Sequence, residues 1–160
     1  MSALMSQPSS SGGKLPSDAV AAVQAALGAE HAALWVYGLV SAFLPDSFNA
    51  PVTEGNTAHR ARRDATERLL ADGGATPQPA EPAYVPPQPV TDQKSALGVL
   101  VVAESDTTVA WRAVLERTDD KNVRRAALEA LTTAAVRATR WRRAAGQTPA
   151  APAFPGAAAK

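Results

Sequence analysis

The sequence predicts an all-α protein built as a four-helix bundle. Alanine and leucine are abundant, whereas aromatic residues make up only 5% of the 160 residues, a composition that favours helices over strands. Apolar residues recur at intervals of three and four over several long segments, as on the buried face of a helix. Most of the 13 prolines lie outside these segments. A chain of this length forms one domain and buries roughly 70% of its unfolded surface.

The first helix is expected over residues 17–44. Pro16 suits a helix start and Pro45 a helix stop. One face carries apolar residues at heptad spacing, with an acid in the middle. This face consists of Val20, Val23, Leu27, Glu30, Leu34, Tyr37, Ser41 and Leu44. A buried carboxylate is costly unless it is paired, hydrogen-bonded or bound to metal, so Glu30 marks a candidate site.

Three further helices are expected over residues 51–72, 91–118 and 120–145. Gly73-Gly74 ends the second, and aspartates suited to capping precede the third and the fourth, at Asp92 and Asp120. The third helix repeats the pattern of the first, with Glu104 inside an apolar face. In both helices an aromatic residue follows the acid by seven positions, Tyr37 after Glu30 and Trp111 after Glu104.

Residues 75–90 are proline-rich and are expected to form an extended crossover. At about 3.1 Å per residue this segment reaches about 50 Å, whereas a helix of about 23 residues is about 35 Å long. The crossover can therefore run the length of the bundle and start the third helix at the far end. Such a connection between helices two and three, flanked by two short ones, is the topology of ferritin-like bundles.

The segments outside the bundle, which spans residues 16–146, are expected to carry little structure. Residues 1–15 are rich in serine and glycine and form a disordered leader without the features of a signal peptide. Residues 147–160 form a Pro/Ala-rich tail that docks through Phe154. Without a signal-peptide pattern a cytoplasmic protein is expected, and the apolar run of residues 32–44 is shorter than the ~20 residues that a membrane-spanning helix needs. With no cysteine, disulfides and thiol chemistry are excluded.

A dinuclear metal site of the ferritin-like type needs one carboxylate from each of two helices and a Glu-x-x-His pair from each of the other two. Glu30 and Glu104 match the first requirement. The second helix supplies His59 but has Asn56 where the acid should be, and Glu129 of the fourth helix is followed at three residues by a threonine. The ligand set is therefore incomplete.

Two interpretations of these residues stay open. Arg63 lies one turn after His59 on the same face, and an arginine repels cations but binds carboxylates in bidentate fashion. The favoured interpretation is therefore a buried polar network of Glu30, His59, Arg63 and Glu104, with no cofactor. The alternative is an iron or manganese site on Glu30, His59 and Glu104, in an oxidase-like protein.

Two surface features suggest partners. The first helix has a second apolar face, Trp35, Leu39 and Phe43, which is expected to be covered by the proline-rich loop, by the tail or by a second copy in a homodimer. The fourth helix ends with Arg137, Arg140, Arg142 and Arg143, which suits the helix dipole and makes nucleic-acid binding a lesser alternative. A net charge of +1 gives no general attraction to polyanions or membranes.

Over about residues 17–156 the chain resembles an alanine-rich, ferritin-like bacterial family whose function is unassigned. The matching segments are Ala29-Glu30-His31, Tyr37-Gly38, Ala58-His59-Arg60-Ala61-Arg62-Arg63-Asp64, Pro82-Ala83-Tyr84, Pro89-Val90-Thr91-Asp92, Ala103-Glu104, Arg140-Trp141-Arg142 and Phe154-Pro155-Gly156. The resemblance implies a ferritin-like four-helix fold and no established activity. No phosphate loop, nucleophile elbow or metalloprotease motif occurs, so a non-catalytic structural or interaction domain is the predicted function.

Overall fold

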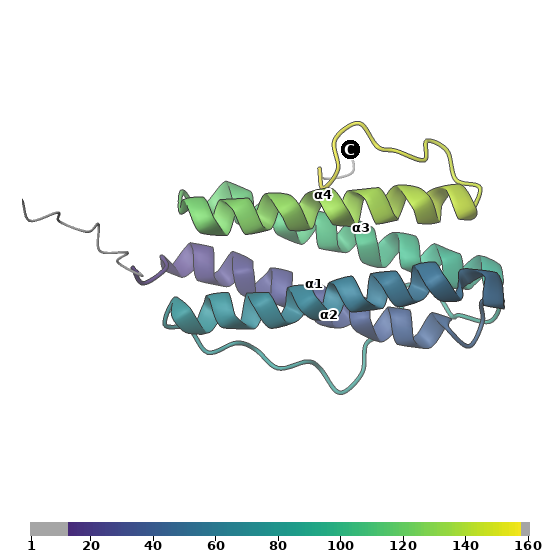
Figure 1. Cartoon of the computed structure of the whole chain (residues 1–160), viewed down its shortest axis with the longest axis horizontal. Helices are drawn as coiled ribbons and strands as arrows, with labels where there is room; N and C mark the ends of the chain where they lie inside the picture. The colour runs from purple at the N-terminus through teal and green to yellow at the C-terminus, as the bar shows by residue number, and fades with distance from the viewer. Residues whose placement is uncertain (1–12, 158–160) are drawn as a thin grey trace, which may run out of the picture.

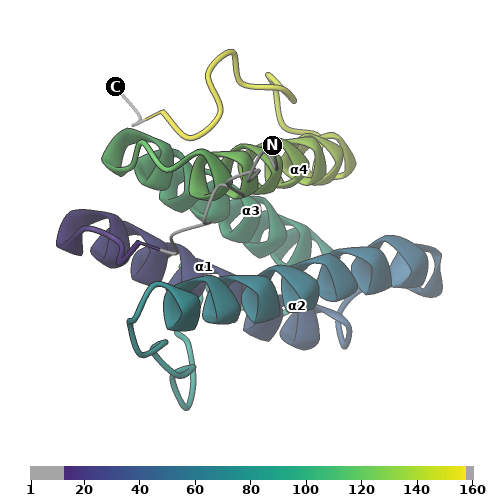
Figure 2. The ribbon, with the colours of Figure 1, turned by 60° about the vertical axis from the view of Figure 1, so that its left-hand side comes forward.

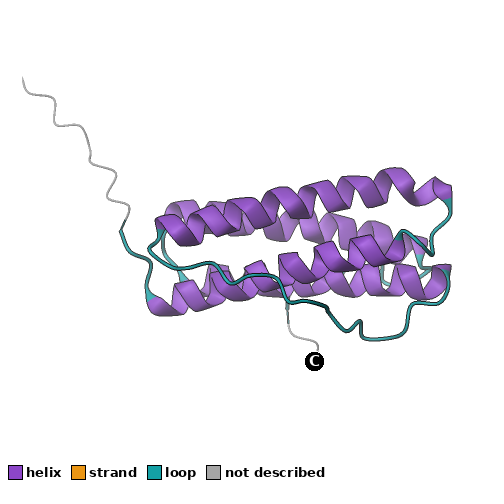
Figure 3. Cartoon of the chain, turned by 90° about the horizontal axis from the view of Figure 1, so that it is seen from below, coloured by secondary structure: helices purple, strands orange, loops and turns teal. Residues whose placement is uncertain are grey.

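A computed structural model of the protein describes residues 13–157 as a four-helix bundle (Figure 1). The helices are α1 (Ser17–Val40), α2 (Asn49–Asp72), α3 (Gln93–Arg117) and α4 (Lys121–Ala144), and a 3-10 turn, η1 (Asp46–Phe48), precedes α2. The loop of residues 73–92 runs along the bundle, so that α3 points in the same direction as α2 (Figure 3). The predicted all-α bundle with a long crossover between the second and third helices is confirmed. The predicted leader lies outside the described residues up to residue 12.

The helix boundaries follow local chemistry. α1 ends at Val40, four residues earlier than predicted, because the chain tightens into i to i−3 turns before Pro45, with the Phe43 N–H donating to the Val40 carbonyl at 2.9 Å. The capping aspartates act as expected. Asp92 accepts from the Ser95 N–H at 2.8 Å in a capping box, and Asp120 accepts from two backbone N–H groups of α4.

The packing of the helices is uneven. α1 packs against both α2 and α3, and α3 packs against α4, whereas α2 and α4 meet at few points (Figure 2). In the described chain α1 is long and apolar enough to cross a membrane by length and composition, a test that buried core helices also pass. Its position between two helices accounts for that composition. The core has two apolar clusters, one around Val36, Leu100 and Trp141 and the other around Leu27 and Trp111.

The crossover is held against α1 by three side chains. Gln24 donates to the Thr76 carbonyl at 2.7 Å and accepts from the Gln78 N–H at 3.0 Å, and His31 lies 3.3 Å from the Gln78 carbonyl. Further along, the ring of Trp35 packs against that of Tyr84 with centroids 6.3 Å apart.

The crossover therefore covers part of the second apolar face of α1, while Leu39 and Phe43 of the same face remain half-buried. Dimerisation through this face stays a prediction.

The tail folds back over α3 and α4 (Figure 1). Its close approach is at Gly156, which has a φ of +76° and where an added Cβ would lie 2.6 Å from the Thr108 carbonyl oxygen. Phe154, through which docking was predicted, borders a groove on these helices but is 77% exposed.

The first testable prediction concerns Gly55. A Cβ at this position would overlap the ring of Tyr37, which is buried and held by hydrogen bonds. We expect Gly55→Ala to lower the free energy of unfolding by about 1–3 kcal/mol, as overpacking does in other cores. Urea denaturation measures this change.

Gly28→Ala is the matched control. Gly28 lies in the middle of α1, and a Cβ added there would meet nothing packed against it within 4 Å. Alanine should raise stability there by about 0.5–1 kcal/mol, because it is the better helix former. Equal effects at the two glycines would contradict the packing described here.

Candidate functional site

The centre of the bundle holds a histidine between two carboxylates. His59 of α2 lies with Nδ1 2.7 Å from Glu30 Oε2 of α1 and Nε2 3.0 Å from Glu104 Oε1 of α3. All three side chains are at most 1% exposed. Facing two ionised carboxylates, both ring nitrogens donate and the ring is an imidazolium. The structure thus brings together three of the four predicted site residues.

Aromatic donors complete the coordination of the acids. Trp111 Nε1 donates to Glu30 Oε1 at 2.7 Å, and the Tyr37 hydroxyl donates to Glu104 Oε1 at 2.5 Å. Because α1 and α3 are antiparallel, each aromatic residue seven positions after one acid reaches the acid of the other helix. The repeated acid-to-aromatic spacing of the sequence is therefore a pair of reciprocal hydrogen bonds. These bonds link the polar centre to the apolar clusters on either side of it.

The arginine of the network comes from α4, and the prediction of Arg63 was wrong. Arg137 Nε donates to Glu104 Oε1 at 2.9 Å, and its side chain is only 13% exposed. Arg63 instead pairs with its neighbour Asp64 at 2.6 Å. Arg62 donates to the Ala126 carbonyl at 3.3 Å. Arg62 and Arg63 therefore have partners other than Glu30 and Glu104.

Trp141 of α4 closes the network on the side of Tyr37. Its Nε1 donates to the Tyr37 hydroxyl at 2.8 Å, so this hydroxyl both accepts and donates. The Tyr37 and His59 rings lie 5.2 Å apart. All four helices therefore contribute side chains to one buried network, which consists of Glu30, Tyr37, His59, Glu104, Trp111, Arg137 and Trp141. Glu104 Oε2 is the one carboxylate oxygen of this network with no partner among the described residues.

The charges of the network balance. Burial lowers the pKa of His59, but its hydrogen bonds to Glu104 and Glu30 and the charges of these acids outweigh burial and raise the pKa to about 9. Burial raises the pKa of Glu104, but His59 and Arg137 reverse this effect and hold the pKa below its usual value. Burial and the neighbouring Glu104 raise the pKa of Tyr37, which stays a neutral donor. At neutral pH two anions thus face two cations.

These residues do not fit a metal ion as they stand. A ligating histidine must present a free ring nitrogen, yet both nitrogens of His59 are engaged with Glu30 and Glu104. Arg137 adds a positive charge beside Glu104, where a cation would be repelled. Within residues 13–157 no group of three or more His, Asp or Glu side chains is arranged to hold a metal. The second histidine, His31, contacts the crossover and not the acids of the network.

Three arginines of α4 are engaged within the protein, whereas Arg142 and Arg143 form no ion pair among the described residues. Arg124 donates to the carbonyls of Leu115 and Thr118 at 2.6 and 2.9 Å, and Arg140 pairs with Glu54 at 3.2 Å. With Arg137 bound to Glu104, these guanidinium groups have intramolecular partners. This arrangement weakens the argument for a phosphate-binding surface on α4.

Two sequence signals point to the residues that sequence reasoning missed. Ala130, Ala134, Arg137 and Trp141 follow heptad spacing, which places Arg137 on the buried face of α4 and not with the surface arginines. The repeated acid-to-aromatic spacing similarly indicates donors for both acids, a role that the apolar character of the aromatic rings obscures.

The sequence pattern of a domain of unknown function, DUF4439, matches residues 22–159. The chain belongs to the DUF4439 family. The predicted membership of a family without an assigned function is confirmed. Among solved structures, this DUF4439 chain is similar to that of a conserved hypothetical protein, Rv2844, from Mycobacterium tuberculosis. The two share 40% identity over 87% of this chain and 98% of the other, with a TM-score of 0.80. A search of curated proteins found no match.

The second prediction separates the two arginines. Arg137→Gln removes a cation from a buried carboxylate, which should lower the free energy of unfolding by about 3 kcal/mol. Arg63→Gln removes a cation from a surface pair, in which both side chains are partly exposed, and should cost at most about 1 kcal/mol. Chemical denaturation of both variants tests this difference, and a larger loss for Arg63→Gln would refute the assignment.

The third prediction concerns pH. The pKa of His59 is about 9 in the folded protein against 6.5 for an unperturbed histidine. The resulting stabilisation is complete below pH 6.5 and is lost as the pH rises through 9. The free energy of unfolding should therefore fall by about 3 kcal/mol over this range.

Proton NMR of His31→Gln provides the direct measurement, because the sequence has only two histidines and this variant leaves His59 alone. The ring protons of His59 should titrate near pH 9. Titration at or below pH 6.5 would show that no imidazolium lies between the acids.

Proposed function

We propose that this DUF4439 domain is a non-catalytic, ferritin-like bundle with a structural or interaction role, in which an ion-pair network takes the place of a metal centre. The observation that carries the proposal is the position of His59. Its ring lies between Glu30 and Glu104, at 2.7 and 3.0 Å, where a ferritin-like site would hold its metal. A protonated imidazole supplies the positive charge that a cation would supply.

Nearly all polar atoms of the network have hydrogen-bond partners within the bundle, which supports a structural role. Both oxygens of Glu30, both nitrogens of His59 and the hydroxyl of Tyr37 have partners within the bundle. A redox or hydrolytic centre needs a ligand position or a proton acceptor open to substrate. The one network oxygen without a partner among the described residues, Glu104 Oε2, is buried and is therefore not open to substrate.

The hydrogen-bond donors that hold the two acids also support this proposal. Each is held by donors from two other helices or more: Glu30 by His59 and Trp111, and Glu104 by His59 and Arg137 together with Tyr37 of α1. Such bonds fix the arrangement of the helices relative to one another. The domain would then offer a rigid surface to its partners.

The fourth prediction tests the proposal by metal content. Untagged protein, purified without chelator and incubated with iron, manganese and zinc, should retain far less than one equivalent of each metal after desalting, as measured by mass spectrometry. Glu30→Gln should leave the metal content unchanged but lower the free energy of unfolding by about 3 kcal/mol, because His59 loses a buried counter-ion.

Glu67→Gln is the control, because Glu67 is a partly exposed acid on the same helix as His59. It should change neither metal content nor stability appreciably. Retention of about one equivalent of metal that Glu30→Gln abolishes and Glu67→Gln preserves would overturn the proposal in favour of a metal-binding, oxidase-like protein.

A further inference from the structure

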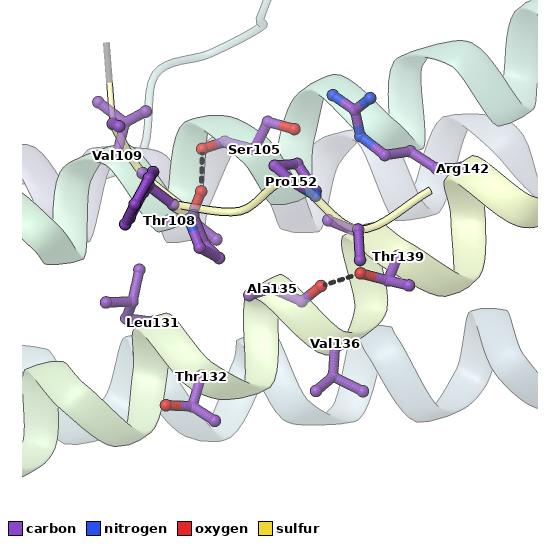
Figure 4. A pocket seen from close by; sticks show the side chains of 16 residues that line it. Ser105, Thr108, Val109, Leu131, Thr132, Ala135, Val136, Thr139, Arg142 and Pro152 are labelled. Carbon is purple, nitrogen blue, oxygen red and sulfur yellow. Dashed lines mark hydrogen bonds between the residues drawn. The ribbon is translucent and has the colours of Figure 1, made fainter. Parts of the chain in front are cut away.

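A groove on the outer side of the bundle is separate from the buried network. It lies between α3, α4 and the returning tail, and has a volume of about 620 Å³. Its walls are formed by Ser105, Thr108 and Val109 of α3, by the side of α4 that carries Leu131, Ala135 and Arg142, and by side chains of the tail between residues 151 and 157 (Figure 4). Sites for small organic ligands have volumes of this order.

Exposed apolar side chains gather at this groove. Val109, Val136 and Phe154 are 47%, 48% and 77% exposed, and all three line it. They are three of the five large apolar residues that are exposed in the described part of the chain. Apolar surface concentrated in one concave place indicates an interaction site, whereas scattered apolar residues do not.

The hydroxyl groups of the groove are already used as donors. Thr108 and Thr139 donate to the carbonyls of Ser105 and Ala135, at 2.6 and 3.0 Å (Figure 4). Ser105 and Thr132 likewise donate to carbonyls of their own helices, at 2.7 Å each. These side chains therefore present mainly methyl and methylene groups to a ligand. The part of the groove lined by these side chains suits an aliphatic chain.

Arg142 is the one charged residue that lines the groove in the described part of the chain. It lies at the end opposite Val109 and Leu131, with its guanidinium extending toward α3 on the side of Ser105 (Figure 4). Its Nε is buried and has no hydrogen-bond partner among residues 13–157, and no acid within this range forms an ion pair with it. A buried donor on a cation without a counter-ion favours an anionic partner.

We propose that this groove binds a medium-chain fatty acid, with the aliphatic chain between α3, α4 and the tail and the carboxylate on Arg142. A single cation at one end specifies a single anionic group, and the planar guanidinium fork matches a carboxylate. The tail covers the chain of the ligand and is held on α3 at Gly156, where only a residue without a Cβ fits against Thr108.

The fifth prediction uses dodecanoate as the probe, titrated below its micellar concentration into the full chain and followed by calorimetry. We expect saturable binding of one equivalent. Arg142→Gln should weaken the binding of dodecanoate by about 10-fold or more, because it removes a charged hydrogen bond, but should leave the binding of dodecanol unchanged. Arg143→Gln, at an adjacent exposed position that does not line the groove, should have no effect on either.

A second variant tests the position of the chain. Ala135→Phe fills the groove from α4 and should abolish the binding of both dodecanoate and dodecanol, while thermal unfolding reports whether the variant is folded. The absence of saturable dodecanoate binding to the natural chain would overturn the proposal. So would equal affinity of the Arg142→Gln and Arg143→Gln variants for dodecanoate. Since the groove and the central network share no residue, metal retention and dodecanoate binding are independent outcomes.

Discussion

The arrangement of the helices depends on two ion pairs that the ring of His59 makes with carboxylates of two other helices. α2 lies across the bundle from α3, and the imidazolium of His59 bridges this distance to Glu104 while it also binds Glu30 of the adjacent α1. α2 has few other inward anchors, since its buried residues are Val52, Gly55, His59, Thr66 and Leu70. A helix with so little apolar surface needs a polar contact to fix its position.

The network also determines the register of the bundle. Glu30 and Tyr37 are two turns apart on α1, about 10.5 Å, and Glu104 and Trp111 repeat this spacing on the antiparallel α3. Sliding one helix by a single turn would separate each acid from its aromatic donor and leave buried charges without partners. The apolar clusters alone would tolerate such a shift better, because alanine and valine side chains at neighbouring turns are similar in size.

The sequence was sufficient to predict the fold, the crossover and the two buried acids, because each depends on local patterns: heptad spacing, proline content and caps such as Asp92 and Asp120. It was also sufficient for His59, which occupies the middle of a polar face. Heptad spacing alone did not decide between Arg63 and Arg137, because it places each of them on the inward face of its own helix. The packing of α4 against α3 decides which guanidinium reaches Glu104. Similarly, the groove exists only because the tail returns over two helices.

The equality of charge within the network limits how such a sequence can change over time. Two carboxylates and two cations from four helices neutralise one another, so replacing any one of them leaves a charge without compensation inside the protein. A change toward a metal site, or away from one, therefore requires substitutions on at least two helices together. Single-step intermediates would be selected against through poor folding. The charged residues of such a centre are therefore expected to persist because folding requires them, whether or not any chemistry is performed there.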